Sequence, residues 1–180
     1  MDEFMVKYRH RLIVVFLIVV LLTSPLPSCA SRQQHASCRA ILESMMTAEL
    51  SLPTGKIYDM NVESGKDEYL SNALICALLP SDSMLGVTED WLDCAVFLPS
   101  TDHPCEFFVV CCQNRDAAKD TALLLGARLA TIKREKEERD GMLEGAKVVV
   151  YGNYVLLIIS ADSENALRSA KAEIRNRSQN

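Results

Sequence analysis

Apolar residues are most concentrated in Lys147–Ser160, where two runs rich in β-branched and aromatic side chains flank Gly152 and Asn153. Gly152 has free access to positive φ, and Asn153 tolerates it better than most residues, which suits a two-residue turn of type I′ or II′. The pattern therefore predicts a β-hairpin. Neither arm alternates cleanly between apolar and polar positions, so we expect two central strands that are covered on at least one face and largely on both.

Two segments ahead of the hairpin also have the pattern of strands. In the first, Trp91–Leu98, every second residue is expected on one side of the strand, namely Leu92, Cys94, Val96 and Leu98. The second, Cys105–Cys112, is short, β-prone and bounded by polar residues. Because only a short loop joins the two segments, we expect them to pair antiparallel.

Apolar residues at helical spacing predict four helices. The first covers Cys38–Leu50 with Ser37 as N-cap, and the second runs from Asp67 and Glu68 to the residue before Pro80. The third is the longest, from Arg115 towards Gly141 with Asn114 or Asp116 as cap, and the last follows Asp162 or Ser163. Between the first two helices, residues 52–65 read as loop, with at most a short extended piece around Ile57 and Tyr58.

This order of elements predicts an α+β fold of two N-terminal helices followed by ββαββα. Two hairpins, each followed by a helix, give a four-stranded, mainly antiparallel sheet with helices packed on a face. A chain of 180 residues suits one well-buried domain, which we place at residues 38–176, with residues 177–180 as a frayed tail.

The N-terminus has the pattern of a signal peptide, expected to cover residues 1–28. Three cationic residues, Lys7, Arg9 and Arg11, precede the unbroken apolar run Leu12–Leu22. That run has eleven residues, whereas a helix that spans the bilayer needs about 20. The run therefore indicates a signal-peptide core rather than a membrane-spanning helix.

Leu26-Pro27-Ser28-Cys29 resembles the lipobox of bacterial lipoproteins. Cleavage would fall between Ser28 and Cys29, and the Cys29 thiol and amine would carry fatty acyl chains such as palmitate. Residues 29–37 would be a lipidated tether, and Cys29 would anchor the protein to the cell membrane on its extracytoplasmic face. The alternatives are a plain secretory signal with a coincidental cysteine, or an uncleaved anchor.

Charge argues against two classes of partner. The formal net charge is −5, and removal of residues 1–28, which carry three cations and two carboxylates, leaves −6. Nucleic acid requires a basic surface to neutralise phosphates, and the charged run after Ile132 alternates in sign, so we expect no nucleic-acid partner. The same balance argues against a basic surface that adheres to anionic lipid.

Six cysteines remain if Cys29 is lipidated, an even number that permits three disulfides. Their spacing has no recognised framework, so we expect buried free thiols in preference to disulfides. Cys111 and Cys112 are neighbours in a strand and should point to opposite faces. No C-x-x-C motif occurs, and His103 with Cys105 could supply only two of the four ligands that zinc requires, so no metal or cofactor is predicted.

The sequence contains none of the recognised catalytic motifs, so we expect a binding or envelope-associated module, with an unknown protein or small molecule as partner, rather than an enzyme. His103, Glu106 and Arg128 are the candidate residues for a ligand or partner surface. The alternative is an extracytoplasmic enzyme that uses a Cys/His loop near His103 and Cys105. A third possibility is a structural partner of another envelope protein.

Several short motifs resemble those of a family of small lipoproteins from Gram-positive bacteria, known as domain of unknown function forty-three fifty-eight. The motifs are LPTGKIY at 52–58, EYLS at 68–71, HPCEF at 103–107, Ala127-Arg128-Leu129 and VVVYGNYVLLIIS at 148–160. The resemblance covers residues 40–175. It implies an extracytoplasmic domain on a lipid anchor, and it supplies no activity, ligand or catalytic residue.

Overall fold

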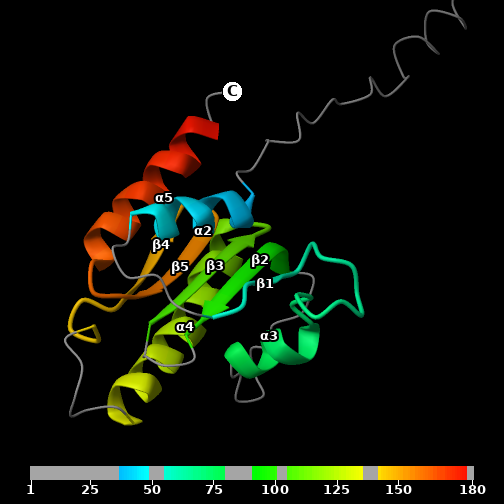
Figure 1. Cartoon of the computed structure of the whole chain (residues 1–180), viewed down its shortest axis with the longest axis horizontal. Helices are drawn as coiled ribbons and strands as arrows, with labels where there is room; N and C mark the ends of the chain where they lie inside the picture. The colour runs from blue at the N-terminus through cyan, green and yellow to red at the C-terminus, as the bar shows by residue number, and fades with distance from the viewer. Residues whose placement is uncertain (1–36, 49–54, 80–90, 101–104, 136–141, 178–180) are drawn as a thin grey trace, which may run out of the picture. The chain divides into compact units, whose positions relative to one another are not determined.

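The computed structural model describes residues 37–48, 55–79, 91–100, 105–135 and 142–177. In these residues the chain forms an α+β fold of four helices and a five-stranded antiparallel sheet with helices packed against it (Figure 1). The strands are β1 (Tyr58–Asp59), β2 (Leu92–Pro99), β3 (Glu106–Cys112), β4 (Lys147–Tyr151) and β5 (Tyr154–Ile159), in the spatial order β1-β2-β3-β5-β4. The helices are α2 (Cys38–Thr47), α3 (Asn72–Leu78), α4 (Arg115–Glu135) and α5 (Ser163–Arg177).

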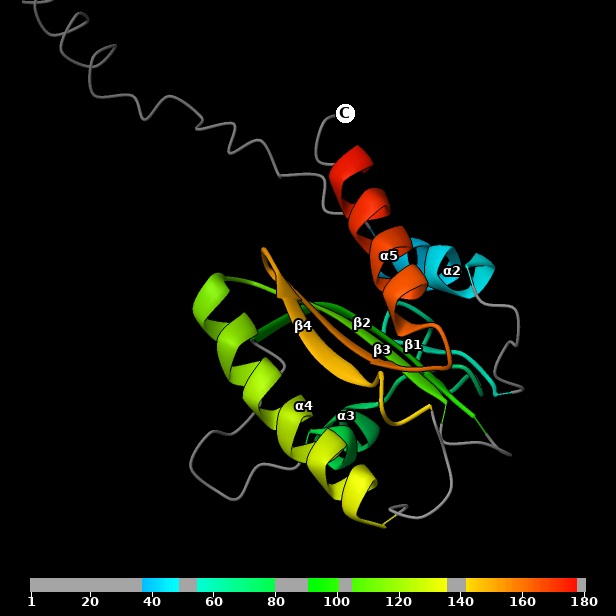
Figure 2. The same ribbon diagram turned by 90° about the vertical axis from the view of Figure 1, so that its left-hand side faces the viewer.

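The helices cover both faces of the sheet, where the sequence pattern predicted one. We call the two apolar cores by their helices: the α3/α4 core includes Phe97, Phe108 and Leu125, and the α2/α5 core includes Ile41, Phe107 and Leu167. Figure 2 shows the sheet edge-on between the two helix pairs. The physical reason is that β3 and β5 have no polar face: every residue in both strands is buried, so each face needs its own helices.

The hairpin forms as predicted, but only one of its arms is a central strand. Tyr151 pairs with Tyr154 across the turn, and Gly152 takes a φ of 64°. β5 lies inside the sheet and is fully buried, whereas β4 is an edge strand. Val150 is 43% exposed, so the expectation that both arms are central was wrong for β4. An apolar sequence did not distinguish a central strand from its edge neighbour.

β2 and β3 pair antiparallel as expected, but a β-bulge changes which side chains share a face. The register shifts between Leu92 and Cys94. Leu92 therefore joins the α3/α4 core, whereas Cys94, Val96 and Leu98 pack with the α2/α5 core. Strict alternation had placed all four on one side, which is wrong for Leu92 because a bulge adds one residue to the period.

The fifth strand, β1, comes from the segment that the sequence pattern left as loop with a short extended piece. Tyr58 pairs with Phe97 of β2. On the other side of β1, the backbone N–H of Asp59 donates to the Glu68 carbonyl at 2.8 Å, and the Leu70 N–H donates to the Asp59 carbonyl at 3.1 Å. The residues around Glu68 therefore bond to β1. The prediction that they begin the second helix was wrong.

The helix caps follow the sequence closely. Ser37 accepts from the Ala40 N–H at 3.1 Å and caps α2, as predicted, and Ser71 accepts from the Leu74 N–H at 3.2 Å, which starts α3 later than expected. Of the two proposed caps for α4, Asn114 is the one used. The inward side of α5 is as predicted, with Ala166, Leu167, Ala170 and Ile174 buried.

Replacing Asn114 with alanine is expected to destabilise the fold by about 1 kcal/mol. The Asn114 side-chain oxygen accepts from the N–H groups of Asp116 and Ala117 at 3.0 and 2.9 Å, and alanine leaves both donors to water. Urea unfolding followed by circular dichroism measures the difference. Asn114→Ser is the control, because serine keeps a side-chain oxygen that can accept at the cap and should cost much less than alanine. Equal losses for both variants would show that the cap hydrogen bonds are not the cause.

Several sequence predictions lie outside the described residues. These are the signal peptide, its cleavage between Ser28 and Cys29, the tether up to residue 36, His103, and the ends of the first and third helices at Leu50 and Gly141. Among the helices that the structure does describe, none combines the length and the apolar composition needed to cross a bilayer.

Candidate functional site

Two of the three candidate surface residues meet in the structure. Glu106 is the first residue of β3, and Arg128 lies in the second half of α4. The Arg128 guanidinium donates from Nε to Glu106 Oε1 and from its terminal nitrogen to Oε2, each at 2.9 Å. This two-point contact is the strong form of an arginine–carboxylate pair, because both hydrogen bonds are charge-assisted and the planar groups match.

The pair lies against aromatic side chains at the border of the α3/α4 core. The Arg128 guanidinium carbon is 5.9 Å from the centre of the Phe97 ring, which itself packs edge-on against Phe108 at 5.4 Å between ring centres. The side chains of Arg128 and Glu106 are 22% and 11% exposed. Partial burial strengthens the attraction between the charges, so the pair ties α4 to the sheet.

This geometry gives the two residues a structural role, and the ligand or partner surface stays a prediction. Both oxygens of Glu106 and two nitrogens of Arg128 are engaged with each other, so an incoming ligand would have to compete with a bidentate pair. The third candidate, His103, lies outside the described residues. The sequence named Glu106 and Arg128 without their contact, and a separation of 22 residues gives no local signal that would have found it.

The cysteines depart from the expectation of free thiols at two positions. Cys38, the first residue of α2, forms a disulfide with Cys94 of β2, with a Cα–Cα distance of 6.2 Å. Cys111 and Cys112 are free, buried and on opposite faces, as predicted, whereas Cys76 is free but exposed. The disulfide was missed because its half-cystines lie 56 residues apart and each also fits an apolar position of its own element.

A third sulfur lies beside the disulfide. Cys111 is the partner of Cys94 across β2 and β3, and both side chains face the α2/α5 core. Burial raises the pKa of the Cys111 thiol to about 12, and the charge of Asp93 adds a smaller contribution in the same direction. A side-chain hydrogen bond with Tyr154 lowers this pKa but only partly offsets the rise. Because the thiolate is the attacking species in disulfide exchange, Cys111 is a poor nucleophile at neutral pH.

The described residues show no set of groups suited to a metal ion. Among them, no cluster of three or more histidine, cysteine, aspartate or glutamate side chains occurs. Cys105, which the enzyme alternative would use, is 6% exposed and packs in the α2/α5 core with Phe107 and Cys111. A thiol in that position would have to leave the core before it could reach a substrate.

No protein-family model, curated protein or solved structure matches this chain. The resemblance to a lipoprotein family therefore stays a prediction, and functional inference rests on the residues themselves.

Proposed function

We propose that this protein is a lipoprotein of the extracytoplasmic face of the cell membrane, anchored through Cys29, whose α+β domain acts as a binding or envelope-associated module. The observation that carries the proposal is the ordered pattern of the N-terminus: three cations, eleven apolar residues and a lipobox that ends in cysteine. Each part alone is common. Their sequence and spacing fit export followed by lipidation of one sulfur atom.

The Cys38–Cys94 disulfide is compatible with that location. Disulfides persist in oxidising compartments outside the cytoplasm and are rare within it, where thiols are kept reduced. Cys38 lies nine residues after Cys29, so the covalent link would tie the start of the domain close to the anchor. The alternative of an enzyme would use Cys105, whose side chain is buried in the α2/α5 core.

Changing Cys29 to serine is expected to abolish lipidation. In a Gram-positive host grown with an alkyne analogue of palmitate, the full chain should take up the label and should lack residues 1–28 by mass spectrometry. The Cys29→Ser variant should carry no label, and it should be released to the medium or remain an uncleaved precursor.

Cys76→Ser is the matched control, since Cys76 is the exposed free cysteine of the described residues and its loss should leave labelling unchanged. Retention of the label by Cys29→Ser, or an intact Met1 on the wild-type protein, would contradict the proposal. Loss of the label in the Cys76 variant alone would place the modification on the domain instead.

A further inference from the structure

Among the residues that the structure describes, no further strand lies beside β4, whereas the opposite edge of the sheet is closed. On the β1 side, Asp59 exchanges backbone hydrogen bonds with residues 68–70, which occupy the outer edge of that strand. β4 has a neighbour only in β5 among the described residues. Figure 2 views the molecule from this side and shows β4 in front, between α4 and α5. Of the two sheet edges in the described part of the chain, β4 is therefore the one that can accept a further strand.

The direction of the backbone groups on β4 follows from the register. The Asn153 carbonyl accepts from the Cys112 N–H at 2.8 Å, so the backbone groups of Asn153 point towards β3 and those of Tyr154 point the other way, towards β4. Hydrogen-bonding direction alternates along an antiparallel strand, and Tyr154 pairs with Tyr151. Tyr151, Val149 and Lys147 thus bond to β5. The N–H and C=O groups of Val148 and Val150 point outward from the sheet.

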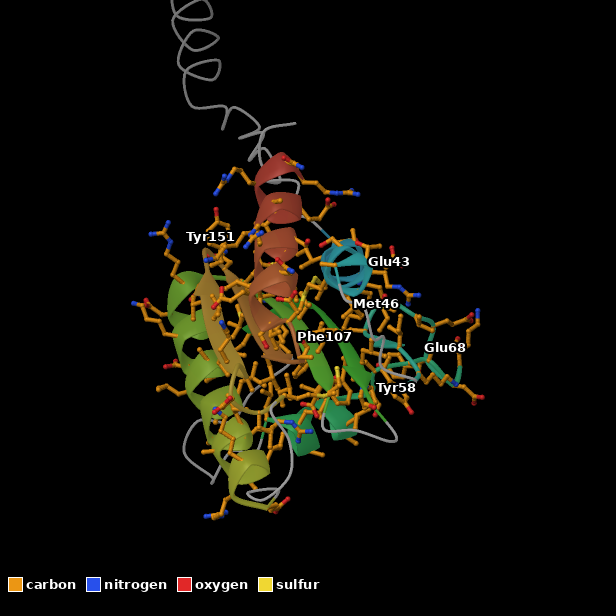
Figure 3. The ribbon with its side chains drawn as sticks, turned by 60° about the vertical axis from the view of Figure 1, so that its left-hand side comes forward. Glu43, Met46, Tyr58, Glu68, Phe107 and Tyr151 are labelled. Atoms are coloured by element: carbon orange, nitrogen blue, oxygen red, sulfur yellow. A yellow bond between two sulfur atoms is a disulfide. The ribbon has the colours of Figure 1, made fainter. Side chains whose placement is uncertain are left out.

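Cations border this edge on the side of α5. One stripe along the helix is formed by residues at intervals of three or four. It begins with an acidic residue, Glu164, and continues with three cations, Arg168, Lys171 and Arg175. Two contacts place the stripe beside β4: Lys147 pairs with Glu164, and the Lys171 ammonium is 5.9 Å from the centre of the Tyr151 ring. Tyr151 lies at the turn end of β4, as Figure 3 shows. Arg168 and Arg175 are exposed.

Cations also border the edge on the side of α4. Lys133 donates to the carbonyl of Ala146, the residue before β4, at 3.4 Å. Arg115 precedes Lys133 by five full helical turns, so both lie on the flank of α4 nearest β4. Lys119, one turn after Arg115, lies on the same flank and is paired with Asp116 at 2.8 Å. Arg128 extends from the other flank, towards β2 and β3. The open edge therefore has basic residues above and below it in a protein whose net charge is −5.

We propose that the β4 edge binds an extended acidic peptide segment as a sixth strand of the sheet. The outward N–H and C=O groups of Val148 and Val150 would pair with the peptide backbone, and the exposed Val150 side chain would contact one of its apolar side chains. Because side chains alternate between the two faces of a strand, acidic residues at every second position would share one face and reach the cations of α5. The intervening apolar residues would lie on the α4 face, where Val148 packs against the α3/α4 core.

The basic flanks also argue against a second copy of the same chain at this edge. Antiparallel pairing of β4 with its own copy about a two-fold axis normal to the sheet would put the α5 stripe of each copy beside that of the other. Arg168, Lys171 and Arg175 would then face like charges, which opposes association. An acidic strand makes the same backbone contacts without that repulsion. The inference gives the proposed binding module a class of partner, and rests on that proposal only for the location of the protein.

Binding is to be measured on the full chain in neutral detergent, by fluorescence anisotropy of a labelled peptide of alternating glutamate and valine, EVEVEVE. Two control peptides separate the contributions: KVKVKVK reverses the charge, and EVEPEVE keeps the charge but loses a backbone donor. Of the three peptides, we expect saturable binding of EVEVEVE and of neither control. The triple variant Arg168→Gln, Lys171→Gln and Arg175→Gln should weaken it about tenfold, since three charge contacts at the protein surface are lost.

Val150→Pro tests the backbone contact, because it removes an N–H that points out of the sheet and leaves the bonds to β5 in place; we expect a loss of about tenfold. The matched control for the charge variant replaces Arg39, Lys56 and Lys66 with glutamine, which removes the same charge away from β4. It should have no effect on binding.

Three outcomes would overturn the proposal. The first is absence of binding by EVEVEVE at millimolar concentration. The second is binding of EVEPEVE as tight as that of EVEVEVE, which would mean that the edge binds any polyanion. This comparison uses the wild-type protein, so it does not depend on whether a variant folds. The third is that the protein binds no peptide but binds anionic phosphatidylglycerol vesicles, and that the α5 triple variant loses this vesicle binding. The basic flanks would then be a membrane-binding surface. Because Cys29→Ser tests the anchor separately, either idea can fail without the other.

Discussion

Removing the Cys38–Cys94 disulfide is expected to lower the free energy of unfolding by roughly 4 kcal/mol. The bridge closes a loop with a sequence separation of 56, and in the chain-entropy treatment a loop of that size restricts the unfolded chain by this amount. The variant to measure is Cys38→Ala with Cys94→Ala, because a single substitution would leave Cys94 beside Cys111 and able to form a new pair. Alanine avoids a hydroxyl at the fully buried Cys38 position.

The reductant provides an independent measure of the same quantity. Urea unfolding of the wild-type chain should shift with excess dithiothreitol by nearly the same free energy, whereas the double variant should be insensitive to reductant. Cys76→Ala is the control for loss of a cysteine outside the bridge and should behave as wild type. Free thiols at both Cys38 and Cys94 in the purified native protein, shown by alkylation and mass spectrometry, would refute the prediction at its premise.

The sequence was most informative where one local signal determines structure. The Gly152 turn, the Ser37 cap and the inward side of α5 were all predicted from a few neighbouring residues, because turn geometry, capping and helical periodicity are local physical constraints. The limits have equally specific causes. The bulge at β2 moved Leu92 to the other face, and a two-residue strand such as β1 is too short to show any period.

Long-range partners were not predictable from the pattern. Nothing in the sequence near β4 distinguishes an edge strand from a central one, since both arms of the hairpin are apolar and the order β3-β5-β4 is decided by how the hairpins pack. The disulfide and the ion pair of Glu106 with Arg128 could not be predicted for the same reason. Each joins residues that are brought together only when the sheet is assembled. The sequence therefore named Glu106 and Arg128 as candidates, but their contact with each other is seen only in the structure.

Replacing Arg128 with methionine is expected to destabilise the fold by about 2 to 3 kcal/mol. Methionine keeps a long apolar side chain over the Phe97 ring, but it leaves the Glu106 carboxylate buried without its counter-ion. The expected loss is at the lower end for buried pairs because the Arg128 side chain keeps 22% exposure, which admits some water to the pair. Urea unfolding followed by circular dichroism measures it.

A double-mutant cycle isolates the interaction from the other effects of each substitution. Glu106→Gln keeps the shape of the side chain and removes its charge, so the variant with both changes should recover part of the stability that Arg128→Met loses, with a coupling of at least about 1.5 kcal/mol. The matched control is the exposed pair of Asp116 and Lys119 on the same helix, where Asp116→Asn and Lys119→Met should show no measurable coupling. If Glu106 and Arg128 also proved uncoupled, the guanidinium and carboxylate would be available to a ligand after all. The surface predicted from the sequence would then regain the binding role that the bidentate contact argues against.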